Sequence, residues 1–374
     1  MQLSHSENTY NEELVEKSLW ISLSNIHGVG SQTFCQLLKT FGNPANIYAA
    51  NHKQLKEVVS DKIAVEITKG VDEEALRDSL HWLSQANNHL VTLADSHYPK
   101  ALLEISDPPP FLYAKGNLAL LNIPSIAIVG SRNASVQGEK NAEAFAQGLS
   151  GYNLCIVSGL ALGIDGAAHR GALKANGATI AVVGTGLDIV YPARHRDLAH
   201  QIVERGLIIS EFALGTPSKP QNFPKRNRII SGLSLGCLVV EANLQSGSQI
   251  TARLSAEQGR EVFAIPGSIH SPMSKGCHQL IKQGAKLVDC LQDIVEELDL
   301  INATENVAET SNYSDNKTPP QNSLLTLMGY EPITLENIVH LSGLTVSEVS
   351  SMLMLLELEG SVASLAGGQY QKIM

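Results

Sequence analysis

Short apolar runs that alternate with helix-like stretches constrain the fold of this chain more than any other feature. Each run is three to five residues long, and several end at glycine, serine or glutamate. The seven runs are Ile126–Val129, Cys155–Val157, Thr179–Val183, Leu207–Ile209, Cys237–Val240, Val262–Ile265 and Lys286–Val288. Short apolar strands separated by helices are typical of a parallel sheet that is covered on both faces. The pattern therefore predicts a doubly wound α/β domain, whose ligands bind beyond the carboxyl ends of the strands.

The residues that follow the runs predict an anion site at this edge of the sheet. Gly130, Ser131 and Arg132 separate the first run from a helix-like stretch that starts near Ser135. Free N–H groups and the dipole of a helix N-terminus favour a phosphate, and Arg132 adds a full positive charge. The same edge collects Ser158, Gly159, Gly184, Gly186, Glu211, Glu241 and the turn Ser246-Gly247-Ser248. Two structural alternatives stay open: Arg132 closes a surface salt bridge, and the small residues at the turn permit close helix–sheet packing.

A second segment, QNFPKRNRIISG at 221–232, places three cations around one aromatic residue. Lys225, Arg226 and Arg228 follow Phe223 closely. Cations beside an aromatic ring suit a chain of phosphates that carries unpaired bases. The alternative is that Phe223 belongs to the core.

Asp165 and His169 are the candidates for acid–base chemistry. They are four residues apart in a helix-like stretch and so share one face of it. The alternative is structural, with Asp165 orienting His169 or capping backbone amides near the anion site. We assign no catalytic residue, because no serine or cysteine nucleophile pairs with them. We expect no cofactor either, because GxGxxG does not follow the first strand and GxxxxGK[ST] does not occur.

The net charge of the whole chain argues against binding to nucleic acid, but the charges are distributed unevenly along the sequence. The whole sequence has a formal net charge of −10. Residues 125–299, however, hold 16 Lys and Arg against 15 Asp and Glu, whereas residues 1–124 hold 9 against 14 and residues 300–374 hold 2 against 8. Salt screens charges beyond about 8–10 Å, so a local basic patch in the middle segment can still bind phosphates.

The remaining composition indicates a cytoplasmic protein without a metal or a membrane span. The five cysteines form no CxxC pair and no metal-binding spacing, and they are interpreted as reduced thiols. The first residues are polar and acidic, without a signal-peptide pattern. No apolar run approaches the roughly 18–20 residues of a membrane span.

Four segments are expected along the chain. Residues 1–110 are predicted to be helical, with a helix-hairpin-helix-like turn at Gly28-Val29-Gly30, and residues 111–300 to form the α/β core. A polar linker is expected at 301–322. Residues 323–374 predict two helices and a hairpin in a winged-helix arrangement. Because this last segment has Lys372 as its single cation, a protein contact is favoured over DNA.

Six segments, in order, resemble the DNA-processing protein A (DprA/Smf) family. They are IVGSR at 128–132, SGLALGIDGAAHRGAL at 158–173, TIAVVGTGLDIVYPARH at 179–195, FPKRNRIISGLS at 223–234, VVEANLQSGSQITA at 239–252 and GREVFAIPGS at 259–268. The resemblance implies an extended Rossmann-like core between a helical, helix-hairpin-helix or SAM-like N-terminal domain and a winged helix. It also implies a homodimer without catalytic activity that binds single-stranded DNA, protects incoming strands in natural transformation and loads the RecA recombinase.

The resemblance and the residue patterns together give a set of candidate site residues. The DNA-binding candidates are Ser131, Arg132, Gly159, Phe223, Lys225, Arg226, Arg228, Ser246 and Ser248. The resemblance also implies dimer or RecA contacts in the stretch Ser274–Ala285, with His278, Leu280 and Ile281 as candidates.

Two other functions stay open. One is a Rossmann-like hydrolase of a mononucleotide that uses Asp165, His169 or Glu241, and the other is a scaffold with neither activity.

Overall fold

The computed structural model describes residues 5–300, 324–325, 327–328, 333–358, 361–365 and 368–372, with the backbone alone for residues 5–13, 358 and 365. The chain divides into two compact units, Met1–Val307 and Ala308–Met374. The linker predicted at 301–322 lies outside the described residues. Among the residues described, no single helix has the length and apolarity to cross a membrane; the helical stretches Leu335–Ser342 and Val346–Glu357 meet that test only as a pair bent by 111°.

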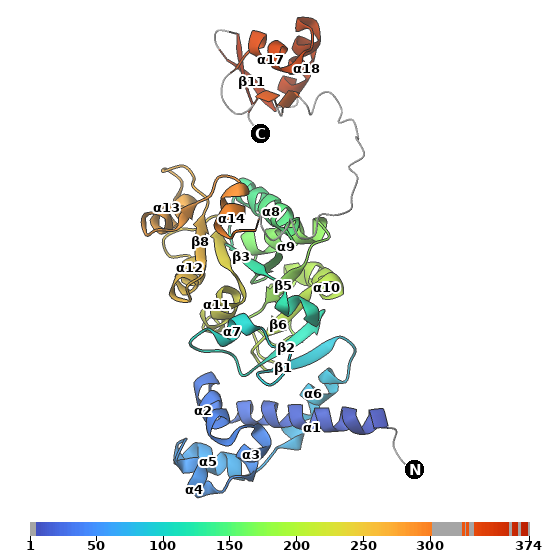
Figure 1. Ribbon diagram of the computed structural model, residues 1–374, viewed down its shortest axis with the longest axis vertical. Helices are drawn as coiled ribbons and strands as arrows, with labels where there is room; N and C mark the ends of the chain where they lie inside the picture. The colour runs from blue at the N-terminus through green and yellow to red at the C-terminus, as the bar shows by residue number, and fades with distance from the viewer. Residues whose placement is uncertain are drawn as a thin grey trace. The chain divides into compact units, whose positions relative to one another are not determined.

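The first unit begins with six helices (Figure 1). They are α1 (His5–Asn25), α2 (Ser31–Phe41), α3 (Pro44–Ala49), α4 (His52–Lys56), α5 (Asp61–Thr68) and α6 (Glu73–Leu83). Apolar residues at helical spacing, such as Leu23 and Leu37, are buried in one cluster, in which the Trp20 and Phe34 rings stack with centroids 5.4 Å apart. The predicted helical region is therefore present, and its turn at Gly28-Val29-Gly30 joins α1 to α2.

The core of the first unit is a nine-stranded sheet in the order β1-β2-β6-β5-β4-β3-β7-β8-β9. All seven predicted runs form strands in it. The strands are β1 (Asn88–Thr92), β2 (Phe111–Gly116), β3 (Ser125–Val129), β4 (Cys155–Ser158), β5 (Thr179–Val182), β6 (Leu207–Ser210), β7 (Gly236–Val239), β8 (Glu261–Ala264) and β9 (Lys286–Leu287). Neighbours from β6 to β9 are parallel, as predicted.

The strands β1 and β2 are absent from the sequence analysis. They pair with each other and with β6 in antiparallel fashion and so extend the sheet at one edge. β1 directly follows the helical region, and β2 directly follows Pro108, Pro109 and Pro110. β1 also lies inside residues 1–110, although it belongs to the large sheet.

Helices cover both faces of the sheet (Figure 1). Along β3, Ile126 and Ile128 point to one face and Ala127 and Val129 to the other. The first face packs on α8 (Val136–Ser150), α9 (Ile164–Lys174) and α14 (Gln292–Glu297), and α10 (Arg196–Arg205) covers β5 and β6. The second face packs on α7 (Lys100–Leu103), α11 (Asn222–Leu233), α12 (Gly247–Glu257) and α13 (Lys275–Lys282). This is the predicted doubly wound arrangement. Three short 3₁₀ turns complete it: η1 (Leu118–Asn122), η2 (Ala193–His195) and η3 (Pro272–Ser274).

The second unit has the predicted two helices and hairpin. It comprises β10 (Ile333–Thr334), α17 (Leu335–Ser342), α18 (Val346–Leu358), β11 (Val362–Leu365) and β12 (Gln369–Lys372). The three strands pair in the order β10-β12-β11, and Ile338, Val349 and Leu353 lie in the buried core.

Candidate nucleic-acid interface

A pocket of about 670 Å³ lies beyond the carboxyl ends of β3 and β7, and we call it the strand-end pocket. After β3 the chain adds strands on one side, up to β6, and then returns to add β7 on the other side of β3. Ligands of doubly wound sheets bind at this switch point. The lining includes Ser131, Arg132, Asp165, Tyr191, Phe223, Arg226, Asn227, Ser246, Ser248 and Thr251.

Arg132 and Phe223 meet in this pocket. The Arg132 guanidinium lies over the Phe223 ring, 5.0 Å from its centroid, and the exposed Tyr191 ring lies 5.8 Å from the Phe223 ring. The Phe223 ring also packs close to Gly184, where an added Cβ would lie 3.1 Å from the ring. The two predicted segments are therefore brought together, and a cation and two aromatic rings share one surface.

Arg226 supplies a second positive charge from beneath. It is 4% exposed, and its Nη1 donates to the carbonyl oxygens of Gly159, at 2.8 Å, and Val182. Burial lowers the pKa of Arg226 to about 10, so the group stays charged at neutral pH. A Cβ on Gly159 would lie 2.5 Å from Arg226 Nη2. Gly159 therefore makes room for Arg226 and does not itself line the pocket.

The N-termini of α8 and α12 lie near this edge, and they differ in what surrounds them. The first, of α8, is occupied by the protein, because Ser135 caps it and the Glu241 carboxylate accepts from Ser135 N at 2.9 Å. The second, of α12, lines the pocket through Ser246, Gly247 and Ser248, and its Ser246 side chain accepts from Ser248 N at 3.3 Å. At the start of α8, the Glu241 carboxylate therefore takes the place of the expected anion, whereas the start of α12 faces the pocket.

Asp165 and His169 do not form a pair. Asp165 Oδ2 accepts from Gly159 N at 3.1 Å and from Ala161 N at 3.4 Å, as in the capping alternative. Burial raises the pKa of Asp165, and the charge of Arg226 opposes this shift. His169 is fully buried and does not line the pocket, with Nδ1 2.7 Å from Thr179 Oγ1. The Thr179 hydroxyl donates to Ile156 O, so it accepts from His169 Nδ1–H, and the ring is neutral.

Buried His169 should make the fold sensitive to acid. Burial lowers the pKa of His169 to about 3, whereas an unfolded chain binds this proton near its ordinary value of 6.5. As the pH falls, the unfolded state therefore binds this proton before the folded state does. The free energy of unfolding consequently decreases from about pH 6.5 toward pH 3. We expect His169→Asn to reduce the loss of unfolding free energy between pH 7 and pH 5 by about 2 kcal/mol. Denaturant unfolding of both proteins at the two pH values measures this, and equal losses would contradict it.

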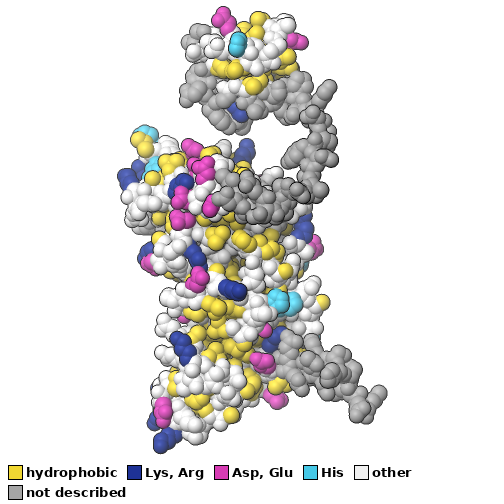
Figure 2. Space-filling model, in the orientation of Figure 1, with side chains coloured by type: hydrophobic (Ala, Val, Ile, Leu, Met, Phe, Trp, Pro, Cys, Tyr) yellow, Lys and Arg dark blue, Asp and Glu magenta, His cyan; other side chains and the backbone are white. Residues whose placement is uncertain are grey.

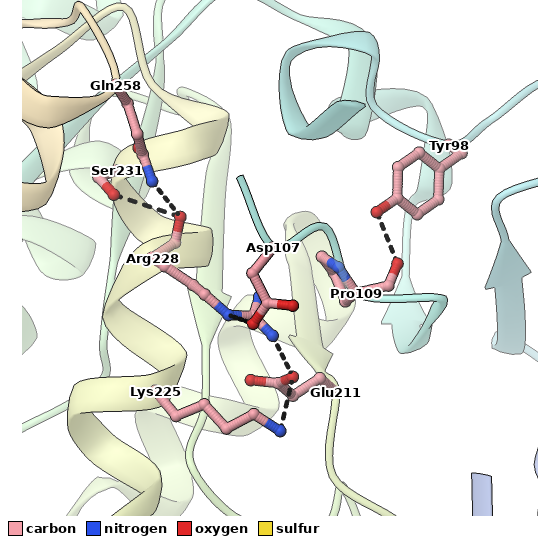
Figure 3. A network of polar contacts seen from close by, with 8 residues as sticks. All are labelled: Tyr98, Asp107, Pro109, Glu211, Lys225, Arg228, Ser231 and Gln258. Atoms are coloured by element: carbon pink, nitrogen blue, oxygen red, sulfur yellow. Dashed lines mark hydrogen bonds and ion pairs between the residues drawn. The ribbon is translucent and has the colours of Figure 1, made fainter. Parts of the chain in front are cut away.

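Lys225 and Arg228 lie outside the strand-end pocket, in a separate ion-pair network (Figure 3). Arg228 Nη2 lies 2.5 Å from Glu211 Oε2, and its Nε lies 3.2 Å from Asp107 Oδ2. Lys225 Nζ lies 3.3 Å from the same Glu211 oxygen. Two cations thus face two carboxylates. The helical spacing of α11 explains the separation, because residues 225 and 228 share one face while 223 and 226 share another.

The candidates on α13 also separate. Leu280 is 6% exposed and lines a second pocket of about 660 Å³ between α12, β8 and α13. Ile281 is half-buried against the core, and His278 Nε2 lies 3.0 Å from Gly267 O. Leu280 is therefore a wall of the second pocket and not a protruding anchor.

Several residues that line or flank the strand-end pocket were not predicted from the sequence. Tyr191 lies in the segment TIAVVGTGLDIVYPARH, where its aromatic side chain was the available signal. Asn227 lies between the two arginines of the basic segment. Lys219 is an exposed cation between the lining residues Ser218 and Pro220. On the face drawn in Figure 2, Lys and Arg are interspersed with Asp and Glu, so no broad basic surface indicates a nucleic-acid site on that face.

Among the described residues, one group has ligand atoms close enough for a metal: Asp289, Cys290 and Asp293. Asp293 Oδ2 accepts from Asp289 N at 3.0 Å and from Cys290 N at 3.2 Å. These bonds lower the pKa of Asp293. The carboxylate thus has a structural role at the start of α14.

Comparison with known proteins gives consistent matches. The family DNA recombination-mediator protein A matches residues 89–299, and the DprA winged helix domain matches residues 308–368. Protein Smf of Escherichia coli is 38% identical over 95% of this chain and 96% of its own length. DNA processing protein DprA of Streptococcus pneumoniae is 50% identical over 56% of this chain and 73% of its own.

Two solved structures agree. The crystal structure of DNA processing protein A from Streptococcus pneumoniae has a TM-score of 0.68 and 40% identity, covering 75% of this chain and 97% of that one. The structure of DNA processing protein A from Helicobacter pylori, which concerns its single-stranded DNA binding mode, has a TM-score of 0.51 and 31% identity, covering 56% and 95%. With the matched family covering most of the sheet and the site, the chain belongs to the DNA-processing protein A (DprA/Smf) family.

Proposed function

We propose that this protein binds single-stranded DNA in the strand-end pocket. The observation that carries the proposal is the convergence of Arg132, Phe223 and the N-terminus of α12 on one pocket at the switch point. Two guanidinium groups face the single carboxylate of Asp165 there, so the local charge favours phosphates. Exposed aromatic rings stack on bases whose faces are free, which only an unpaired strand offers. The Helicobacter pylori relative is a protein with a single-stranded DNA binding mode, which supports the proposed ligand.

Within this proposal, phosphates contact Arg132 and the α12 turn, and bases stack near Phe223 and Tyr191. The buried guanidinium of Arg226 attracts the phosphates through its positive charge. Lys225 and Arg228 are assigned to the ion-pair network and not to DNA, which revises their expected role.

The cellular role follows the family: protection of incoming single strands and loading of RecA in natural transformation, by a cytoplasmic homodimer. Leu287 on the edge strand β9 is 45% exposed, which supports self-association at this edge of the sheet. The second pocket, beside Leu280, Gln279 and Gln283, offers RecA a recessed surface.

The acidic winged helix is proposed as a protein-binding module.

A nucleotide hydrolase is the competing function, and one assay separates the two. His169 is buried away from the pocket, and Asp165 is engaged by backbone amides. We expect a labelled single strand to bind without release of phosphate or free base from DNA, ATP or AMP. Sustained release that is abolished by Asp165→Asn would favour the hydrolase.

Phe223→Ala should weaken single-strand binding about 5- to 150-fold. Stacking of one base contributes roughly 1–3 kcal/mol, and 1.4 kcal/mol corresponds to tenfold. Fluorescence anisotropy with an oligonucleotide measures the effect. Phe212→Ala is the matched control, because that ring lies under Lys225, with Nζ 5.5 Å from its centroid, and outside the strand-end pocket. Equal affinities of the two folded variants would assign Phe223 to the core alone.

A further inference from the structure

The turn that carries Arg132 is hydrogen-bonded to Glu241 at both ends of the turn. The backbone oxygen of Glu241 accepts from Ser131 N at 2.8 Å. Its carboxylate accepts from Ser135 N at 2.9 Å and from the Ser135 hydroxyl at 2.5 Å. Arg132 lies between the two attached residues in the chain. One residue at the end of β7 therefore ties down both sides of the proposed DNA-binding turn.

The surroundings are shaped to accept this side chain. A Cβ on Gly138 would overlap the Glu241 carboxylate, and a Cβ on Gly130 would lie 2.9 Å from the Glu241 backbone oxygen. Ser135 Oγ accepts from Gly138 N at 2.9 Å while its hydroxyl hydrogen goes to Glu241. The carboxylate also complements the positive end of α8. Its position thus depends on several neighbours and not on one exposed contact.

We propose that Glu241 is a positioning residue for Arg132 and that it raises affinity for single-stranded DNA despite its negative charge. The inference rests on the proposed function. Charge alone predicts the opposite effect, because a carboxylate within about 8–10 Å of bound phosphates repels them. Positioning predicts that without Glu241 the turn is loose and must be ordered again when DNA binds.

The test compares Glu241→Ala with Glu139→Ala in the full-length protein. Glu139 lies in the first turn of α8, and its carboxylate is 3.1 Å from Arg170 Nη2, away from the turn. Both variants remove one negative charge. We expect Glu241→Ala to weaken binding of an oligo-dT strand by about 5- to 30-fold, the effect of ordering one residue or so. Glu139→Ala should leave binding unchanged or slightly tighter. Unchanged or tighter binding by Glu241→Ala would overturn the proposal.

A double-mutant cycle tests whether the effect passes through Arg132. In an Arg132→Ala background, Glu241→Ala should have little further effect, because coupled residues are not additive. Full additivity would overturn the proposal. Hydrogen exchange without DNA gives an independent measurement, since amides 131–138 should exchange faster in Glu241→Ala than in Glu139→Ala. If the wild-type protein bound no single strand, the proposed function would fail, and the exchange rates would still decide whether Glu241 holds the turn.

Discussion

Arg132→Ala should weaken single-stranded DNA binding by about 10- to 150-fold. A hydrogen bond to a charged group contributes roughly 1.5–3 kcal/mol, and each 1.4 kcal/mol is tenfold. Arg132 is exposed, lies over the Phe223 ring and lines the strand-end pocket, so its charge is available to a phosphate. The loss of one phosphate contact should also flatten the log–log dependence of affinity on salt by about 0.7.

Anisotropy titrations at several salt concentrations measure both quantities. Arg77→Ala is the control, because it removes the same charge from an exposed position on α6, 3.8 Å from Glu74. An Arg132→Ala protein that is folded and keeps the wild-type affinity and salt slope would remove Arg132 from the site.

Arg228→Ala should instead lower the free energy of unfolding, by about 3–5 kcal/mol, as expected when one partner of a buried ion pair is removed. The Arg228 and Glu211 side chains are 9% and 4% exposed, and the variant leaves Glu211 and Asp107 without this cation. Affinity for single-stranded DNA per folded molecule, and its salt slope, should stay close to those of the wild type.

Lys225→Ala is the matched control for stability, since Lys225 pairs with the same Glu211 oxygen but is 47% exposed. Exposed pairs contribute only about 0–1 kcal/mol. Denaturant unfolding of the three proteins gives the comparison. A stable Arg228→Ala protein that had lost DNA binding would show that Arg228 is a DNA contact after all.

The core of the fold is predictable from the sequence because strand and helix patterns there are strong. Runs such as Ile126–Val129 are apolar at every position, since both faces of β3 are covered, and all seven became strands. β2 was not predictable in the same way. It follows three prolines, and its partners are separated from it in the sequence, β1 by an irregular stretch and β6 by about ninety residues, so its pairing has no local signal.

The candidate site was predictable in outline but not in detail. Strand ends locate the edge, and residue types suggest phosphates and bases. Which cations are free depends on distant acids: Arg228 meets Glu211 and Asp107, and the start of α8 receives Glu241 from β7. The residue spacing within the segments that carry Arg228 and the start of α8 does not predict these contacts, because the acidic partners lie elsewhere in the chain. The helical phase of α11 could have separated Arg226 from Lys225 and Arg228.

The measurement that tests the central claim most directly is the binding of one labelled oligonucleotide, as a single strand and as a duplex, at about 50 and 200 mM salt. The rings of Phe223 and Tyr191 need free base faces, and Arg132 with the α12 turn needs phosphates. We therefore expect the single strand to bind more tightly than the duplex at both salt concentrations, and both affinities to fall as salt rises. Duplex bound as tightly as single strand at both concentrations, or no binding of either, would contradict the claim.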